Sequence, residues 1–187
     1  MKVLIVDNFD SFTYNLKHYV EQFSNHVIVL RSNEIDVLNL NEYDKIILSP
    51  GPGLPYEHRI LNELLSIYHK NKSILGVCLG HQSIAHFFGA DLINLDNVLH
   101  GTSTQITHNN NCRIFKGLPN TFQVGHYHSW TVSKDNFPDV LSITSENDEG
   151  IITSFKHKKY DLTGIQFHPE SVLTDFGLDI LNNWLTY

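Results

Sequence analysis

The stretch of sequence that decides the fold is Ile74-Leu75-Gly76-Val77-Cys78-Leu79-Gly80. A short apolar run, typical of a buried strand, leads into a cysteine between two glycines, and apolar positions at helical spacing follow. This is the strand–turn–helix context of a nucleophile elbow, with cysteine in place of serine. Glycines two residues before and after the nucleophile leave room for the strained turn. The pattern predicts that Cys78 is a nucleophile at the end of a strand.

Two features of this elbow suit thiol chemistry. The start of a helix stabilises a thiolate, which is the reactive form of cysteine. The backbone N–H of Leu79 would point into the site, so we expect it to be one oxyanion donor. The alternative is a buried structural cysteine, because free cysteine is often a core residue. The second cysteine, Cys112, has no strand-to-helix context and is not expected to be catalytic.

Strand and helix patterns alternate through the first half of the chain. Strands buried on both faces are predicted at residues 3–6, 27–30, 45–48 and 74–77. Helices are predicted at residues 11–23, at residues 60–68 and from the elbow through Phe88. Ser11 is a plausible N-cap. Such alternation means right-handed βαβ units with helices on both faces. We expect an α/β fold with an open, mostly parallel, twisted sheet, as in flavodoxin-like proteins.

The second half of the chain has a different pattern. From about Leu92 the helical signal disappears and short strands recur, at residues 103–107, 122–127, 140–144, 151–155 and 162–167. A last helix is predicted at residues 178–185. This half should form an antiparallel β extension of the sheet. Because no repeat, low-complexity tract or linker is visible, residues 1–187 are expected to be one domain.

A candidate base lies in Gly164-Ile165-Gln166-Phe167-His168-Pro169-Glu170. His168 follows a predicted strand, and open α/β sheets bind ligands at that edge. A cysteine nucleophile needs a base, and the base needs an orienting group. In an extended segment, residues i and i+2 share a face, and Pro169 favours such a backbone at His168. We predict that Cys78, His168 and Glu170 act together.

The sequence Ser49-Pro50-Gly51-Pro52-Gly53 follows the third predicted strand and should lie at the same sheet edge. A dinucleotide-binding loop is excluded because position 56 is Tyr56 rather than glycine, and no Gly-Lys-Ser/Thr sequence occurs for a phosphate loop. We expect a stiff loop whose Gly51 N–H is the second oxyanion donor. An ordinary turn is the alternative.

Composition limits the function classes. Thirteen Lys and Arg oppose twenty Asp and Glu, which gives a formal net charge of −7, and no basic stripe suited to nucleic acid is present. No apolar run approaches the roughly 20 residues of a membrane helix, and the start does not read as a signal peptide. We therefore expect a cytoplasmic protein with no nucleic-acid or membrane partner.

Together these segments resemble the class I, triad-type glutamine amidotransferases. The elbow through His81-Gln82 and the segment Gln166 to Ser171 are near-perfect matches to the family motifs. Asp7-Asn8-Phe9-Asp10-Ser11-Phe12-Thr13-Tyr14-Asn15-Leu16 looks like the opening of the amidotransferase subunits of anthranilate synthase and aminodeoxychorismate synthase. The resemblance extends from Asp7 to Trp184.

The resemblance implies an activity and its site residues. The chain would hydrolyse L-glutamine through a cysteinyl-glutamyl thioester and deliver ammonia to a chorismate-using synthase subunit (component I), with no cofactor of its own. Residues that match the family's glutamine-binding positions are Gly51, Pro52, Gly53, Gln82, Ser129 and Trp130. For the last two, the backbone would hold the α-groups of glutamine. His100 and Gly101 match a segment that contacts the synthase.

The chain also departs from the family pattern. Thr102 stands where Lys is frequent, Trp130 stands where Leu is more common, and residues 54–58 lack the usual small side chains. These departures concern the partner contact and the shape of the substrate pocket. Gly53 favours the anthranilate members, since aminodeoxychorismate members often have cysteine there.

Other functions fit parts of the sequence. A stand-alone Cys-His-Glu hydrolase would use the same residues on larger amides. A non-catalytic flavodoxin-like receiver module would use Asp7, but it leaves His168 and Glu170 without a role. His126 and His128 could suggest a metal, yet no third ligand stands at a telling spacing, so no metal is expected.

Overall fold

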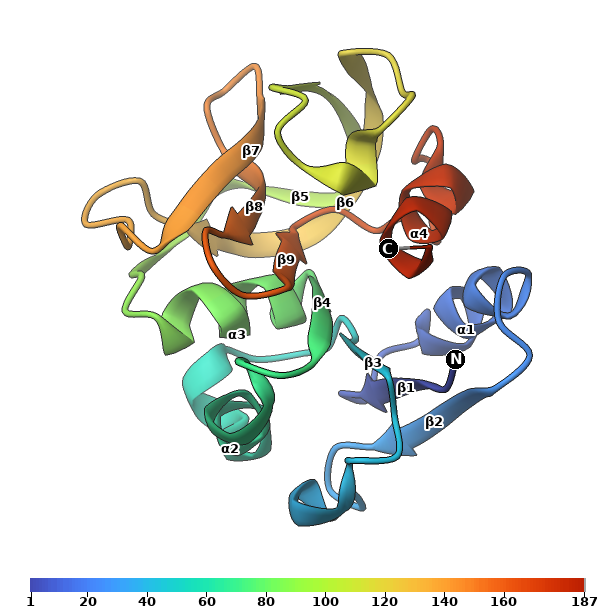
Figure 1. Ribbon diagram of the computed structural model, residues 1–187. Helices are drawn as coiled ribbons and strands as arrows, with labels where there is room; N and C mark the ends of the chain where they lie inside the picture. The colour runs from blue at the N-terminus through green and yellow to red at the C-terminus, as the bar shows by residue number, and fades with distance from the viewer. Residues whose placement is uncertain (187) are drawn as a thin grey trace.

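Nine strands form one sheet in the computed structural model, which describes residues 1–186 (Figure 1). The order across the sheet is β2-β1-β3-β4-β9-β8-β7-β5-β6. In chain order the strands are β1 Val3–Asp7, β2 Val27–Arg31, β3 Lys45–Leu48, β4 Ser73–Val77, β5 Leu92–His108, β6 Thr121–Val132, β7 Leu141–Asn147, β8 Ile152–His157 and β9 Leu162–Ile165.

The sheet has a parallel half and an antiparallel half. Strands β2, β1, β3, β4 and β9 run parallel to one another. Strand β8 reverses direction against β9, and β7, β5 and β6 continue the antiparallel part. The expected fold, a mostly parallel α/β sheet with an antiparallel extension, is confirmed.

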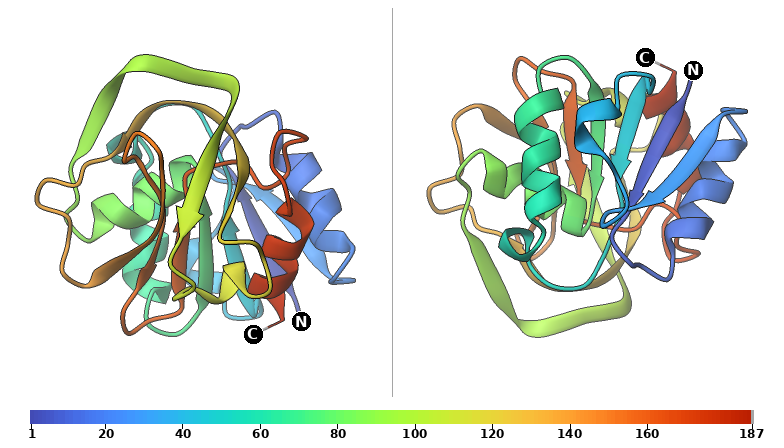
Figure 2. Two further views of the ribbon diagram at one scale, coloured as in Figure 1. Left: turned by 90° about the horizontal axis from the view of Figure 1, so that it is seen from above. Right: turned by 90° about the horizontal axis from the view of Figure 1, so that it is seen from below.

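Two pairs of helices cover the parallel half from opposite sides. Helices α1 Thr13–Glu21 and α4 Gly177–Leu185 lie on one face, and α2 Arg59–Tyr68 and α3 Leu79–Phe87 lie on the other (Figures 1 and 2). Alternate residues of β1 enter the two cores: Val3 and Ile5 pack with α1 and α4, whereas Leu4 and Val6 pack with α2 and α3. Burial on both faces explains the continuous apolar runs of these strands.

The structure corrects several predicted elements in the parallel half. Helix α1 begins at Thr13, and its N-cap position is Phe12 rather than Ser11. Two aspartates organise this turn instead: Asp10 Oδ2 accepts from the Phe12 N–H, and Asp7 Oδ1 accepts from Thr13 Oγ1. Strand β2 is not buried on both faces, because it forms the edge of the sheet.

Strands β5 to β8 are longer than predicted, whereas β9 ends at Ile165 rather than Phe167 and pairs parallel to β4. Strand β5 begins at Leu92 rather than Ser103, and β6 continues to Val132. Most of β5 is exposed, so its sequence carries no alternation of apolar and polar residues. Its first part arcs away from the body of the molecule (Figure 2, light green).

Candidate active site

Cys78 occupies the strained turn that the sequence predicts. It lies between the end of β4 and the start of α3, with φ 50° and ψ −101°. A Cβ on Gly76 would approach the Gly80 carbonyl to 2.4 Å, and a Cβ on Gly80 would approach the Leu48 carbonyl to 2.3 Å. Both glycines are therefore required by close packing around the elbow, as expected.

The sheet topology brings the other candidate residues to Cys78. Strands β3, β4 and β9 are parallel neighbours, so the segments that follow them emerge at the same edge. The Cys78 N–H donates to the Ile165 carbonyl at 2.9 Å, which places the cysteine beside the segment that carries His168. Leu79 is the first residue of α3, and the first N–H groups of a helix have no partner within the helix.

His168 and Glu170 form a buried pair. His168 Nδ1 lies 2.7 Å from Glu170 Oε1, and the two side chains are 2% and 0% exposed. Burial disfavours the imidazolium, but interactions with the Cys78 sulfur and the Glu170 carboxylate outweigh burial and raise the pKa of His168 well above its ordinary value. His168 Nε2 has no aligned hydrogen-bond partner within residues 1–186. Such contacts often tighten only when substrate binds.

One cavity beside Cys78 unites the residues expected to bind glutamine. Its volume is about 180 Å³. Its lining consists of Gly51, Pro52, Gly53, Cys78, Leu79, Gln82, Tyr127, His128, Ser129 and Trp130. All six expected glutamine-site residues are in this lining. The arrangement can hold a small side-chain amide against the sulfur.

A second cavity also has Cys78 in its lining. Its volume is about 510 Å³, and its lining includes Cys78, His168 and His100 together with residues 9–12. Asp10 lies in this lining, and its pKa is raised, chiefly by burial. His100 belongs to the exposed part of β5, next to an irregularity in the pairing with β6. Gly101 is exposed, with φ 68°.

The Pro50–Gly53 loop is held from both ends. Asn8 Nδ2 donates to the Ser49 carbonyl at 3.0 Å, and a Cβ on Gly51 would meet Asn8 within 2.6 Å. His58 Nε2 lies 2.8 Å from the Pro52 carbonyl. The loop is therefore a supported part of the site rather than an ordinary surface turn. His58 belongs to the segment in which this chain departs from the family pattern.

Sequence reasoning missed four contacts. The centroid of the Tyr127 ring lies 4.9 Å from that of His168 and 5.4 Å from that of His100. Gln166 Nε2 lies 3.6 Å from Cys78 Sγ. The Trp130 carbonyl accepts a hydrogen bond from Gln82 Nε2 at 2.7 Å. Because this acceptor is a main-chain group, the contact does not depend on which side chain stands at position 130. The position of Gln166 next to the His168 motif is the one sequence signal for it.

His126 and His128 are hydrogen-bonded to each other. His126 Nδ1 lies 3.0 Å from His128 Nε2, and burial lowers the pKa of His126 to about 3 and that of His128 to about 4. No group of three His, Cys, Asp or Glu side chains in residues 1–186 is arranged to hold a metal ion. Cys112 is buried, and burial raises the pKa of its thiol.

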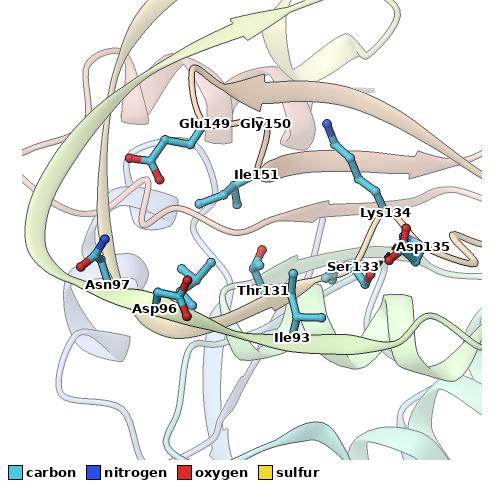
Figure 3. Close-up of a pocket in the computed structure, with 12 residues that line it drawn as sticks. Ile93, Asp96, Asn97, Thr131, Ser133, Lys134, Asp135, Glu149, Gly150 and Ile151 are labelled. Atoms are coloured by element: carbon cyan, nitrogen blue, oxygen red, sulfur yellow. Dashed lines mark hydrogen bonds between the residues drawn. The ribbon is translucent and has the colours of Figure 1, made fainter.

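A separate cavity lies under the start of β5 (Figure 3). Its volume is about 370 Å³, and Thr131, Lys134 and Glu149 are among its lining residues. Neither cysteine nor histidine lines it within the described chain. It therefore offers no thiol or imidazole for the predicted chemistry.

Within the described 186 residues, none of the helices has the length and apolar character to cross a membrane.

Known proteins resemble this chain over almost its whole length. The family model for glutamine amidotransferase class-I matches residues 4–186. Anthranilate synthase component 2 of Pyropia yezoensis is 44% identical over 188 residues, covering 99% of each chain. Aminodeoxychorismate/anthranilate synthase component 2 of Bacillus subtilis is 37% identical over 185 residues, covering 98% of this chain and 95% of that protein.

A solved structure has the same fold. It comes from Thermoplasma acidophilum and is described as a candidate subunit of GMP synthase. Its TM-score is 0.89 at 26% sequence identity, and the match covers 100% of this chain and 92% of that one.

Proposed function

The chain belongs to the class-I glutamine amidotransferase family, and we propose that it is the glutaminase subunit of a chorismate-using synthase. The observation that carries the proposal is the position of Cys78. It stands at a strained elbow, beside the buried His168–Glu170 pair and in one cavity with all six expected glutamine-site residues. No cofactor of its own is needed for the chemistry.

The proposed reaction uses Cys78 as nucleophile. The sulfur attacks the side-chain amide carbon of glutamine, and its proton resides on His168. His168 then protonates the leaving nitrogen, so that ammonia departs and a thioester remains. Water attacks the thioester with His168 as base, which releases glutamate and restores the cysteine. Glu170 orients the imidazole and stabilises its charged form.

Two backbone N–H groups would stabilise the negative oxygen of each tetrahedral intermediate. Leu79 begins a helix, where an N–H group is available, and Gly51 lies in the supported loop that forms another part of the cavity wall. One correctly placed donor lowers the barrier by roughly 3–4 kcal/mol, or about a hundred- to a thousand-fold in rate.

The partner is proposed to be component I of the synthase, docking near residues 100–102 and 7–15. His100 and residues 9–12 line the cavity that reaches Cys78 and His168, and the loop residues Pro50 to Pro52 form another part of its wall. Contact there would reorient the loop so that the Gly51 N–H points at the developing oxyanion. Such a shift requires a contact that differs between the two states.

The test measures glutaminase turnover with and without the synthase subunit and chorismate. We expect a rise of about a hundred- to a thousand-fold when both are present, which is the effect of one oxyanion donor. Equal rates would contradict the coupling and favour the stand-alone hydrolase. Thr102→Lys, at an exposed position within the docking segment, is a variant that should change synthase affinity without changing turnover at saturating synthase.

The proposed product of the assembled synthase is anthranilate. Gly53 supports it, and so does the Pyropia yezoensis relative, which is named for that synthase alone. Aminodeoxychorismate is the second candidate, because the Bacillus subtilis relative is named for both synthases. Supplying the chain to each purified component I, with glutamine and chorismate, distinguishes them by the product formed.

A further inference from the structure

Gln166 contacts the sulfur that carries the proposed chemistry. Its side chain is fully buried directly after β9, and Nε2 lies 3.6 Å from Cys78 Sγ. It has no part in the reaction described above. The groups around Gln166 determine which end of its amide faces the sulfur, and therefore whether the contact is a hydrogen bond.

Neighbouring groups fix the orientation of the Gln166 amide. The Trp130 carbonyl can only accept, so the Gln82 atom 2.7 Å from it must be the amino nitrogen. The same nitrogen lies 3.1 Å from Gln166, which must therefore present its oxygen there. The Gln166 amino group is consequently the end that faces Cys78 Sγ.

A second series of hydrogen bonds ends at the Trp130 carbonyl. His128 Nδ1 lies 3.0 Å from the Trp130 carbonyl and must be a donor, so His128 Nε2 accepts from His126 Nδ1 at 3.0 Å. His126 Nε2 then accepts from Thr104 Oγ1 at 2.9 Å. Each ring is neutral in this arrangement, which agrees with the lowered pKa values that burial produces. The direction of every bond follows from one main-chain acceptor.

We propose that Gln166 is a further catalytic residue, whose amide N–H donates a hydrogen bond to the Cys78 thiolate. The His126–His128 pair is a positioning device, because it holds the Trp130 carbonyl that orients Gln82 and, through it, Gln166. The sulfur is negative before it attacks glutamine and again when the thioester carbon–sulfur bond breaks. A donor at 3.6 Å stabilises both states. This inference rests on Cys78 being the nucleophile.

The test is alkylation of Cys78 by iodoacetamide in the full chain, without glutamine or synthase, followed by mass spectrometry of the Cys78 peptide. Gln166→Leu should lower the rate at pH 7 about ten-fold, equal to about 1.4 kcal/mol, which is near the value of a hydrogen bond to a charged group. The rate at about pH 10, where thiols are ionised without help, should not fall, because a thiolate without this hydrogen bond is at least as nucleophilic. Gln105→Leu, at an exposed position on β5, is the matched control.

Further variants separate this role from a structural one. Gln166→Glu keeps the shape and the bond to Gln82 but puts a carboxylate oxygen against the sulfur, so its rate at pH 7 should fall at least as far. His128→Leu should lower the rate about three-fold, the value of one neutral hydrogen bond, and His128→Asn should restore it because it retains a donor near Nδ1. Wild-type rates at pH 7 for both Gln166 variants, or equal losses at neutral and alkaline pH, would overturn the proposal. Because alkylation requires no turnover, its outcome is independent of whether the chain hydrolyses glutamine.

Discussion

Cys78 and Cys112 are both buried, with 6% and 3% of their surfaces exposed, yet their backbone conformations and polar neighbours differ. Cys78 has a positive φ, begins a helix of nine residues and has His168 and Gln166 against its sulfur. Cys112 has an extended backbone and precedes a 3-10 helix of three residues. Burial raises the pKa of the Cys112 thiol and so favours its unreactive form.

The comparison teaches that burial alone does not distinguish a nucleophile from a core residue. What distinguishes Cys78 is a costly backbone conformation, retained where two glycines make room for it. Both cysteines line a cavity, but only the cavities at Cys78 also include a candidate base, His168, and the expected glutamine-site residues. Each of these differences can be removed separately.

The largest effect is expected from Cys78→Ser. Glutamine-dependent synthesis by the assembled complex should fall by at least about ten-thousand-fold, because the nucleophile is lost. Ammonia-dependent synthesis should be almost unchanged, since free ammonia bypasses this subunit. Cys112→Ser is the matched control and should retain glutamine-dependent synthesis within about two-fold, because single interactions far from the reacting atoms are expected to leave the barrier unaltered. Turnover of glutamine by Cys78→Ser would contradict the assignment.

The next largest effect is expected from the base. His168→Asn should lower the glutamine-dependent rate about a thousand-fold, because one imidazole serves both acylation and deacylation. Glu170→Gln should lower it less, by about a hundred-fold, because the carboxylate only orients and stabilises that ring. Steady-state kinetics with glutamine measure both. If Glu170→Gln were the more damaging change, the assigned roles would be wrong.

A smaller effect should appear in the titration of His168. The folded-state pKa is raised above the ordinary value, so the contribution of His168 to the free energy of unfolding is complete below about pH 6.5 and is lost as pH rises through the folded-state pKa. NMR should show a titration midpoint for His168 well above 6.5. Glu170→Gln and Cys78→Ser should both lower it, whereas Cys112→Ser should leave it in place. If the midpoint were the same in Cys78→Ser as in the wild type, His168 and Cys78 would not be coupled.

Much of this site could be predicted because its local patterns have a direct physical cause. The elbow glycines are forced by contacts of 2.3 and 2.4 Å. The pairing of His168 with Glu170 is found as predicted, but the expected extended backbone is wrong: Pro169 and Glu170 lie in a turn, in which the Ser171 N–H donates to the His168 carbonyl. Strands β1 and β3 are readable because burial on both faces makes them almost continuously apolar. The assignments of catalytic, oxyanion and partner-contact roles remain predictions.

Other features could not be read from local sequence. Gln166, Gln82 and Trp130 meet only because β6 returns to the edge formed by β4 and β9. The start of β5 is exposed, so no apolar pattern marks it as a strand. The prediction that Ser11 caps α1 is wrong, because the competing side chains of Asp7 and Asp10 organise that turn.

The most direct test of the central claim is covalent labelling with an electrophilic glutamine analogue, with both cysteine-containing peptides analysed by mass spectrometry. The account predicts that the label is found on Cys78, that excess glutamine prevents labelling, and that Cys112 stays unmodified. Glu170→Gln should slow the labelling without redirecting it. Label on Cys112, or labelling of Cys78 that glutamine does not prevent, would contradict the claim that Cys78 attacks glutamine.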